Sequence, residues 1–502
     1  MLKGVQTGLF GLTSAFILGF CAWAFVDLDG LNGAIGSGFA WSIDWFGTAW
    51  QIGLLLTFTI ALVIAVTPIA KTKLGGLTVP EFGWFQWSSM ILCTLLAGGG
   101  VFWAAGEPIA HFVSPPPYFA STDSAHRLAV QALAQSYLHW GFLAWSILGS
   151  LTTIILMKLH YEKGHPLAPR TLLVPVFGEA ILSNWIGVLA DACCIIAVVA
   201  GTVGPIGFLG LQVGYGLEVL FDIPNTVWTQ SGVVLGLMAL YTVSALTGVS
   251  KGIQILSRIN IGLGLGLLVY MLFAGPTGFI LSGLGEGLLV YGQNFISMSM
   301  YRVDTGWLGW WTVFFWGWFL GYGPMMAIFI ARISRGRSIR SIILMISIVA
   351  PLVTNVWFTI IGGTGLGLEL NEPGIVSTAF EGFNLPAALL AITQSLPMGF
   401  FVSCLFLVLT TIFVATTGDS MTYVISVSMS KTNETEPPAW LRVFWGVAMG
   451  LTAIILLSVG EKGVQSLQSF IVITAVPVSF VLLPSLWIVP LWVFKWGRDS
   501  GS

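Results

Sequence analysis

The chain has 502 residues, of which 56% are apolar and only 8% are charged, and its formal net charge is -2. A water-soluble domain of this size needs far more charge on its surface, so the composition indicates an integral membrane protein. The nearly neutral charge provides no basic surface, and we expect no nucleic-acid partner. The five cysteines lie inside apolar runs without metal-ligand spacing, which predicts packed thiols.

Apolar runs long enough to cross a bilayer, which takes about 20 residues, follow one another along the chain. The predicted spans are roughly residues 8–26, 50–70, 85–105, 130–156, 185–209, 227–246, 259–281, 309–330, 342–361, 400–424, 443–459 and 470–494. Two other stretches, 284–301 and 385–395, are expected to lie along the membrane surface. The sequence therefore predicts an all-α protein with twelve transmembrane helices.

The basic residues predict which side of the membrane each loop faces. With the N-terminus inside, all but three of the 19 lysines and arginines fall on the cytoplasmic side, the exceptions being Arg127, Arg302 and Lys462. Basic loop residues are enriched on the cytoplasmic side. We therefore expect a multi-pass protein of the inner (plasma) membrane with both termini in the cytoplasm.

The spans also suggest an internal symmetry. Spans three to seven and eight to twelve form two groups of five, and because five is odd the second group enters the membrane from the opposite side, as in an inverted repeat. The predicted organisation is two N-terminal helices (1–75), a first five-helix repeat (76–283), an interfacial helix between the repeats (284–305), a second repeat (306–494) and a short cytoplasmic tail (495–502).

The third and fourth spans carry unusual polar and small residues. The run Gly98–Gly100 removes side chains in mid-membrane, so that backbone carbonyls can face a ligand or an ion; close helix packing is the alternative. Glu107 follows near the outer end of the same span, and a purely structural role for it stays open. His139, in the fourth span, is interpreted as a hydrogen-bonded packing residue.

Aromatic residues gather in the fourth and eighth spans. Trp318 and Tyr322 are four residues apart and share a helix face, and Trp140 and Trp145 could complete an aromatic box with them. Such a box attracts a quaternary ammonium group through cation–π interactions without a carboxylate. The alternative is that these rings only pack or form an interfacial belt.

The tenth span ends in Thr416, Thr417 and Asp419. An acid within the membrane indicates a functional site, and the two threonine hydroxyls beside it are hard oxygens of the kind that sodium prefers, although helix capping at a kink is the alternative. Asp191 in the fifth span is expected to be a hydrogen-bonded structural acid. The spans show no continuous polar lining of the kind that a channel needs, and the five histidines are scattered, which argues against an enzyme.

Four motifs resemble those of the betaine/carnitine/choline transporter family, over nearly the whole chain. They are ARISRGR at Ala331–Arg337, HWG at His139–Gly141, KGIQ at Lys251–Gln254 and TTGDS at Thr416–Ser420. The resemblance implies twelve helices with a five-plus-five inverted repeat, the LeuT-like fold of the sodium-coupled amino-acid transporters. It also implies a homotrimer.

The resemblance assigns candidate site residues as well. The substrate-binding candidates are Trp140, Trp145, Trp318, Phe319 and Tyr322. Leu148 stands where many members have tyrosine, and Phe319 stands where a second tryptophan is usual, which leaves the identity of the substrate open. The sodium candidates are Thr416 and Thr417 with backbone oxygens near Cys93, Leu96 and Phe413, and Thr202 is a looser candidate for a second sodium site.

The function expected from the resemblance is sodium-coupled import of a small methylated onium compound, such as glycine betaine, choline or dimethylsulfoniopropionate. No cofactor other than Na⁺ as the coupling ion is expected. The alternative is a sodium-independent exchanger of the same family. Gln254 occupies the position at which such exchangers carry an arginine, so the resemblance favours sodium coupling.

Overall fold

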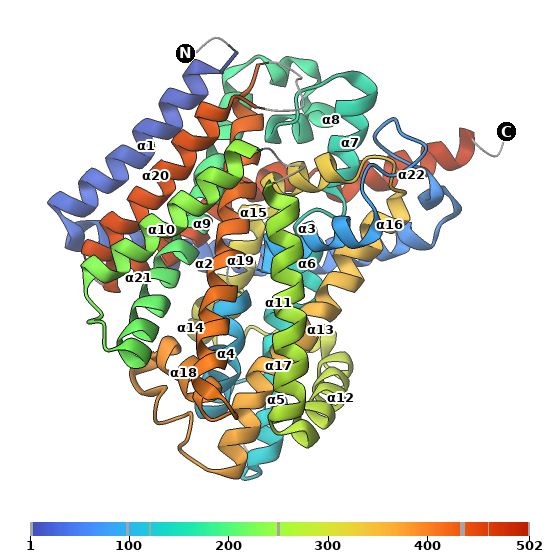
Figure 1. The fold of residues 1–502 in the computed structure, drawn as a ribbon. Coiled ribbons are helices and arrows are strands. Elements are labelled where there is room, and N and C mark those ends of the chain that lie inside the picture. The colour runs from blue at the N-terminus through green and yellow to red at the C-terminus, as the bar shows by residue number, and fades with distance from the viewer. Residues whose placement is uncertain are drawn as a thin grey trace.

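The computed structural model of the chain describes residues 4–96, 100–119, 122–247, 252–431, 437–459 and 461–499. Within these residues the regular structure is helical, apart from two isolated β-bridges (Figure 1). Among them, eleven helical segments are long and apolar enough to cross a membrane. The predicted all-α, multi-pass membrane protein is therefore confirmed.

The helices follow one another in a continuous series. They are α1 (Thr7–Val26), α2 (Leu28–Val66), α3 (Trp84–Leu96), α4 (Gly100–Val113), α5 (Ala125–Trp140), α6 (Phe142–Ile147), α7 (Thr152–Lys163), α8 (Val174–Phe177), α9 (Trp185–Phe221), α10 (Val227–Thr247), α11 (Gly252–Ala274), α12 (Thr277–Gln293), α13 (Phe295–Ser299), α14 (Thr305–Trp310), α15 (Thr312–Ile333), α16 (Ile339–Leu344), α17 (Ala350–Asn371), α18 (Leu385–Gln394), α19 (Gly399–Met429), α20 (Ala439–Ser458), α21 (Glu461–Leu482) and α22 (Ser485–Asp499).

Several predicted segments differ from the observed helices. Helix α2 has 39 residues and begins at Leu28 rather than near residue 50, because the apolar run marks only part of a longer helix whose start is capped by Asp27. The third predicted span is divided between α3 and α4, and residues 97–99, which include Gly98 and Gly99, lie outside the described residues. The surface stretch expected at 284–301 begins earlier, as α12, and continues into α13.

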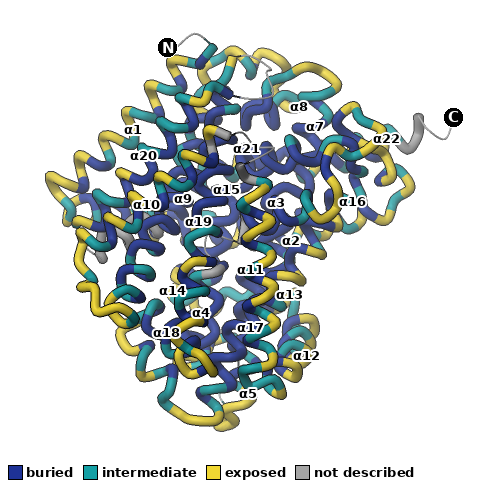
Figure 2. Tube along the Cα trace, viewed as in Figure 1, coloured by how far each residue is buried: buried dark blue, intermediate teal, exposed yellow. Residues whose placement is uncertain are grey.

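The centre of the bundle is formed by the tryptophan-rich segment. Every residue of α15 from Thr312 to Ala331 is buried, whereas only 28% of the residues in the most apolar 18-residue stretches of α1, α10 and α11 are buried. Figure 2 shows the same arrangement, with α15 and α19 dark blue inside and α1 exposed along the outer surface. Aromatic side chains on α15 are therefore packed against other helices on all sides, unlike those of a belt facing lipid.

Two membrane acids are paired with arginines. Arg170 Nε donates to Asp191 Oδ2 at 2.6 Å, which confirms the hydrogen-bonded role expected for Asp191. Arg442 Nη2 donates to Asp419 Oδ1 at 2.8 Å, and both side chains are buried. Because unpaired charges are costly away from water, these pairs stabilise the packing of α9 and of α19 with α20.

The two loops at residues 67–82 and 334–340 form a junction between α2, α3 and α15. Arg337 lies over the rings of Trp84 and Trp87, at 4.1 and 4.5 Å from the guanidinium carbon to the ring centroids. Gly336 N donates to the carbonyl of Leu74 at 2.7 Å. Gly336 has φ +77°, and a Cβ there would lie 2.4 Å from the carbonyl oxygen of Val79, so only glycine fits at this loop junction.

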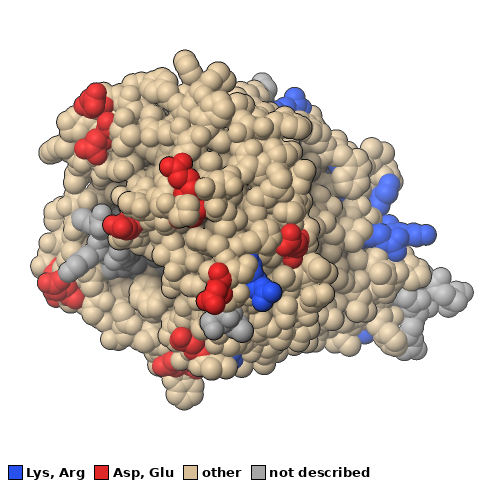
Figure 3. Space-filling model, turned by 90° about the horizontal axis from the view of Figure 1, so that it is seen from below, with Lys and Arg blue, Asp and Glu red and all other residues tan. Residues whose placement is uncertain are grey.

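The loop junction, the start of α1 and helix α22 all lie in the upper half of the molecule in Figure 1. The opposite end, seen from below in Figure 3, shows several acidic side chains and few basic ones. This distribution of charge is the one expected when the upper end faces the cytoplasm.

Candidate substrate and ion site

A break in the fourth span positions its two tryptophans. Helix α5 ends at Trp140 and α6 begins at Phe142, with Gly141 between them. A Cβ at Gly141 would lie 2.2 Å from the carbonyl oxygen of Tyr137, so the break requires glycine. Trp140 and Trp145 therefore belong to different helices, which the regular helix assumed from the sequence did not predict.

Trp140 lies in a cluster of rings at the middle of the bundle. Its ring centroid is 6.3 Å from that of Trp318 and 5.5 Å from that of Phe319, both in edge-to-face geometry. Phe315 and Phe358 also contact Trp140, at 5.0 and 5.5 Å. We call Trp140, Trp318, Phe319 and the neighbouring Tyr322 the aromatic cluster; the sequence identified all four.

The aromatic cluster is closed in this structure. Trp140 is 3% exposed and Phe319 is 8% exposed, and their rings are in direct contact. A cation can bind over these faces only if the rings separate. Phe315 and Phe358 complete the ring of aromatic side chains around Trp140, and neither was predicted. The only sequence signal for them is that they are aromatic residues within predicted spans.

Trp145 is held apart from these ring contacts. It is 1% exposed, and its indole Nε1 donates to the Thr354 hydroxyl on α17 at 2.9 Å. A contact between Trp145 and the substrate stays a prediction. The hydrogen bond fixes the orientation of its ring against α17.

Tyr322 is packed against α9 at a glycine. A Cβ at Gly201 would lie 2.2 Å from Tyr322 Cε2 and 3.1 Å from Trp318 Nε1, so the absence of a side chain allows both rings to approach α9. The hydroxyl oxygens of Tyr322 and Thr202 are 2.9 Å apart. Thr202, the candidate for a second sodium site, is thus in contact with the aromatic cluster.

A buried acid lies next to the aromatic cluster. Trp140 Nε1 donates to Glu107 Oε2 at 2.6 Å, and His139 Nδ1 lies 2.6 Å from Glu107 Oε1. Glu107 and His139 are fully buried. The hydrogen-bonded role expected for His139 is confirmed, whereas the link between Glu107 and Trp140 was missed, although an acid inside an apolar span was the available signal.

Glu107, His111 and His139 are the kinds of residue that bind zinc, and their ligand atoms lie within 4.8 Å of one another. The 2.6 Å separation of Glu107 Oε1 and His139 Nδ1 is that of a hydrogen bond. Two tetrahedral ligands at about 2.0 Å from zinc lie roughly 3.3 Å apart. As arranged, the residues fit a hydrogen-bonded cluster better than a metal site.

A row of rings continues outward from the aromatic cluster. Trp103 lies 5.1 Å from Phe315 and 6.1 Å from Trp311, and Trp311 lies 6.0 Å from Phe383. Trp310, by contrast, is 63% exposed. Trp311 therefore packs within this row of rings, whereas Trp310 has the exposure of an interfacial belt residue.

The sodium candidates lie where α3 meets α19. The Thr417 hydroxyl is 3.2 Å from the carbonyl oxygen of Thr94 and 3.4 Å from that of Phe413. Thr416 donates to the carbonyl of Ile412 at 2.8 Å, and Cys93 Sγ to that of Ser257 at 3.5 Å.

The Thr94 and Ser420 hydroxyls are a further 3.0 Å pair between α3 and α19 that the sequence did not predict. Helix α3 is described as far as Leu96, and nothing is described of the Leu96 side chain. Threonine hydroxyls and backbone carbonyls are hard oxygen ligands of the kind that sodium accepts. The structure thus brings Thr417 and the Phe413 carbonyl together beside α3.

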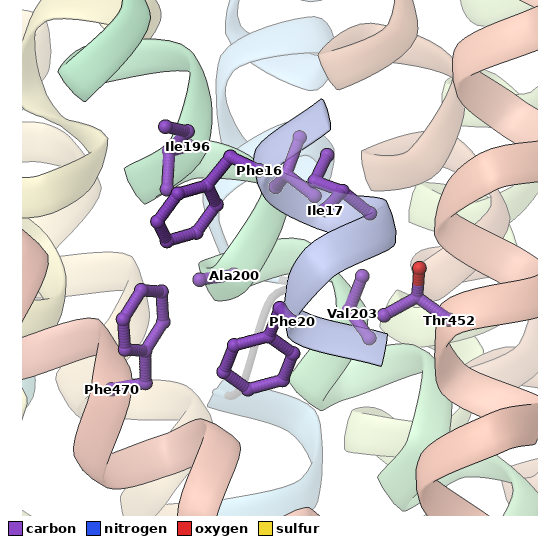
Figure 4. Close-up of a pocket in the computed structure, with 9 residues that line it drawn as sticks. Phe16, Ile17, Phe20, Ile196, Ala200, Val203, Thr452 and Phe470 are labelled. Carbon is purple, nitrogen blue, oxygen red and sulfur yellow. The ribbon is translucent and has the colours of Figure 1, made fainter. Parts of the chain in front are cut away.

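Two apolar cavities lie elsewhere in the bundle. One, of about 20 Å³, is lined by Phe16, Phe20, Val203, Phe470 and neighbours (Figure 4). The other, of about 130 Å³, lies beside Trp50, whose indole donates to Ser479 at 2.7 Å. Neither cavity includes a residue of the aromatic cluster.

Comparisons with known proteins identify the family. The family model described as "BCCT, betaine/carnitine/choline family transporter" matches residues 8–495. The chain belongs to the betaine/carnitine/choline transporter family. It is therefore a transporter and not an enzyme.

Curated relatives of this family transporter cover most of the chain. It is 57% identical over 493 residues to glycine betaine transporter 2 of Vibrio parahaemolyticus, covering 98% of this chain and 91% of the relative. It is 31% identical to an ectoine/hydroxyectoine transporter of Virgibacillus pantothenticus, over 87% of this chain and 86% of that one. A choline transporter of Acinetobacter baylyi is also 31% identical, over 87% and 84%.

Solved structures that resemble the transporter are more distant. A mutant form of a manganese transporter of Eremococcus coleocola is 13% identical with a TM-score of 0.49, over 84% of this chain and 82% of that one. A Na⁺-coupled sialic acid symporter is 14% identical with a TM-score of 0.45, over 88% and 87%. At these scores neither structure carries an argument about the function of this chain.

Proposed function

We propose that the protein is a sodium-coupled symporter that imports a small methylated onium compound, glycine betaine first among them. The observation that supports this substrate class is the aromatic cluster around Trp140 and Trp318. The choice of glycine betaine is supported by the 57% identity to a relative named as a glycine betaine transporter. Electron-rich ring faces attract a quaternary ammonium group and need no direct carboxylate contact. Choline and dimethylsulfoniopropionate present similar methylated cationic heads and are the next candidates.

Sodium binds, in this proposal, between α3 and α19. Thr417 and Thr416 supply hydroxyl oxygens, with backbone oxygens near Cys93, Leu96 and Phe413 completing the shell, and Thr202 belongs to a second site. The contact between Thr417 and the Thr94 carbonyl supports this assignment, because an ion held there links two helices of different repeats.

Transport follows an alternating-access cycle in the proposal. Sodium orders the region where α3 meets α19, and the onium head then enters as Trp140 separates from Phe319. The first repeat helices then rock against the rest of the bundle and open the site to the inside. In the proposal, Trp103 and Trp311, whose ring centroids lie 6.1 Å apart, close the outer side of the site until the rings part.

The remaining features are part of the same proposal. The bundle has twelve transmembrane helices in a five-plus-five inverted repeat, α3 and α4 together forming the third. Both termini face the cytoplasm of a bacterial-type inner membrane, in keeping with the charge distribution of Figures 1 and 3. The protein assembles as a homotrimer.

Uptake of radiolabelled glycine betaine into proteoliposomes tests the proposal. We expect accumulation that requires an inward sodium gradient and collapses when sodium is replaced by potassium. Equal uptake in both salts contradicts the coupling. Counterflow that persists without sodium would identify the alternative, a sodium-independent exchanger, and the absence of any betaine uptake or binding would contradict the substrate class.

A further inference from the structure

The hydrogen bonds around Glu107 fix the tautomer of His139. An indole N–H can only donate, so Oε2 accepts from Trp140. Gln135 Nε2 lies 2.9 Å from His139 Nε2, and because an amide nitrogen only donates, His139 Nε2 is an acceptor and its hydrogen is on Nδ1. His139 is then neutral and donates to Glu107 Oε1 at 2.6 Å.

Because His139 is neutral, ionisation of Glu107 would give the cluster a net negative charge inside the membrane. Its carboxylate accepts two N–H donors, and in the described part of the chain its salt-bridge partners are histidines only. His111 Nε2 is 3.4 Å from Oε1 without hydrogen-bond geometry. Thr312 lies 2.9 Å from His139 Nε2 and adds no charge. A buried carboxylate without a fixed cationic partner is costly, so the ionised form of Glu107 needs a mobile cation as its counter-charge.

We propose that Glu107 is a positioning and selectivity residue of the onium site: it holds the Trp140 ring by its indole N–H and places a negative charge behind that ring. This inference rests on the proposed function. The carboxylate never touches the substrate, because the indole stands between them. It orients the ring face and strengthens its attraction for a cationic head, while the intervening ring prevents a direct ion pair that would slow release.

One pair of ligands distinguishes an effect of Glu107 on the charge of the ligand head from an effect on the fit of its shape. Glycine betaine and 3,3-dimethylbutanoate have the same branched skeleton, but the quaternary nitrogen of the first is a carbon atom in the second. If Glu107 acts through charge, its replacement weakens betaine and leaves 3,3-dimethylbutanoate unchanged or tighter. If Glu107 only supports the fold, both ligands weaken by the same factor.

The experiment measures the dissociation constants of both ligands for the purified full-length wild-type protein and for Glu107→Gln. We expect Glu107→Gln to weaken betaine by on the order of 10- to 30-fold relative to its isostere, the scale of a unit charge about 8 Å away at an effective dielectric constant near 20. Glu369→Gln is the matched control: Glu369 is another buried carboxylate, but it accepts from the backbone amides of Gly374, Val376 and Ser377. It should leave the ratio of the two constants unchanged.

Equal weakening of both ligands, or no change for betaine in a folded Glu107→Gln protein, overturns the inference. If Glu107→Gln does not fold, Glu107→Asp decides, because it keeps the charge: a preserved preference for betaine supports the inference and a lost one overturns it. Failure of the proposed function is distinguishable, since it appears as a wild-type protein that binds no betaine.

Discussion

The hydroxyl of Tyr322 donates to the hydroxyl of Thr202, 2.9 Å away, because Thr202 gives its own hydrogen to the carbonyl of Val198 at 2.7 Å. Tyr322 belongs to the aromatic cluster on α15, and Thr202 is a sodium candidate on α9. A ligand that moves the Tyr322 ring therefore acts directly on Thr202. This single hydrogen bond is a short physical connection between the proposed substrate and ion sites.

Gly201→Ala should weaken substrate binding. The new Cβ would overlap Tyr322 Cε2 at 2.2 Å and force both Tyr322 and Trp318 away from α9. Overpacking of this kind costs about 1–3 kcal/mol, which corresponds to roughly a tenfold or larger rise in the dissociation constant of betaine. Gly204→Ala on the same helix is the control, because its Cβ meets nothing closer than 4.0 Å. Equal affinities for the two variants would contradict the packing described here.

Trp318→Ala should abolish detectable betaine binding, whereas Trp310→Ala should leave the affinity nearly unchanged. The first removes a buried ring from the aromatic cluster; the second removes a ring that is 63% exposed. A cation–π contact with a desolvated tryptophan contributes about 2 kcal/mol or more. Isothermal titration of both purified variants checks this. Retained affinity in Trp318→Ala would mean that the cluster only packs the bundle.

Thr417→Val should raise the sodium concentration needed for half-maximal uptake by about tenfold or more, since it removes a hard oxygen without changing the shape of the side chain. Thr411→Val is the matched control. Thr411 is on the same helix and donates to the carbonyl of Leu407 at 2.8 Å, away from α3. Uptake measured across a sodium series distinguishes the two, and identical curves would exclude Thr417 from the ion site.

Arg442→Met should destabilise the fold. It leaves the buried carboxylate of Asp419 without its arginine, and breaking such a pair costs about 3–5 kcal/mol. Thermal unfolding of the detergent-solubilised protein measures the loss. Glu286→Gln, which breaks a half-exposed contact with His126, should change the stability by less than about 1 kcal/mol. Similar melting temperatures for the two variants would refute the structural role of the buried pair.

The sequence predicted the class, most of the spans and the residues of the aromatic cluster, because apolar length and residue type decide these features. It could not predict that Gly141 interrupts a helix, since the contact with the Tyr137 carbonyl exists only in the folded backbone. It also missed the partnership of Glu107 with Trp140, which are 33 positions apart and meet only when α4 packs on α5. The sequence therefore predicted which segments form helices, but it did not predict which side chains of different helices contact one another.

Arginines of the loop junction have two roles: they carry positive charge, and they donate hydrogen bonds that brace neighbouring helix ends. Arg340 counts as a positive charge for the orientation of the chain, yet its Nε and Nη2 are engaged by the carbonyls of Ala65 and Thr67, at 2.7 and 2.9 Å. A lysine would keep the charge but lose the planar, two-pronged donor geometry. The Arg340→Lys protein would thus insert into the membrane in the same orientation, but the end of α2 would be held less firmly. The contribution of Arg340 to membrane orientation could therefore be measured separately from its contribution to holding α2.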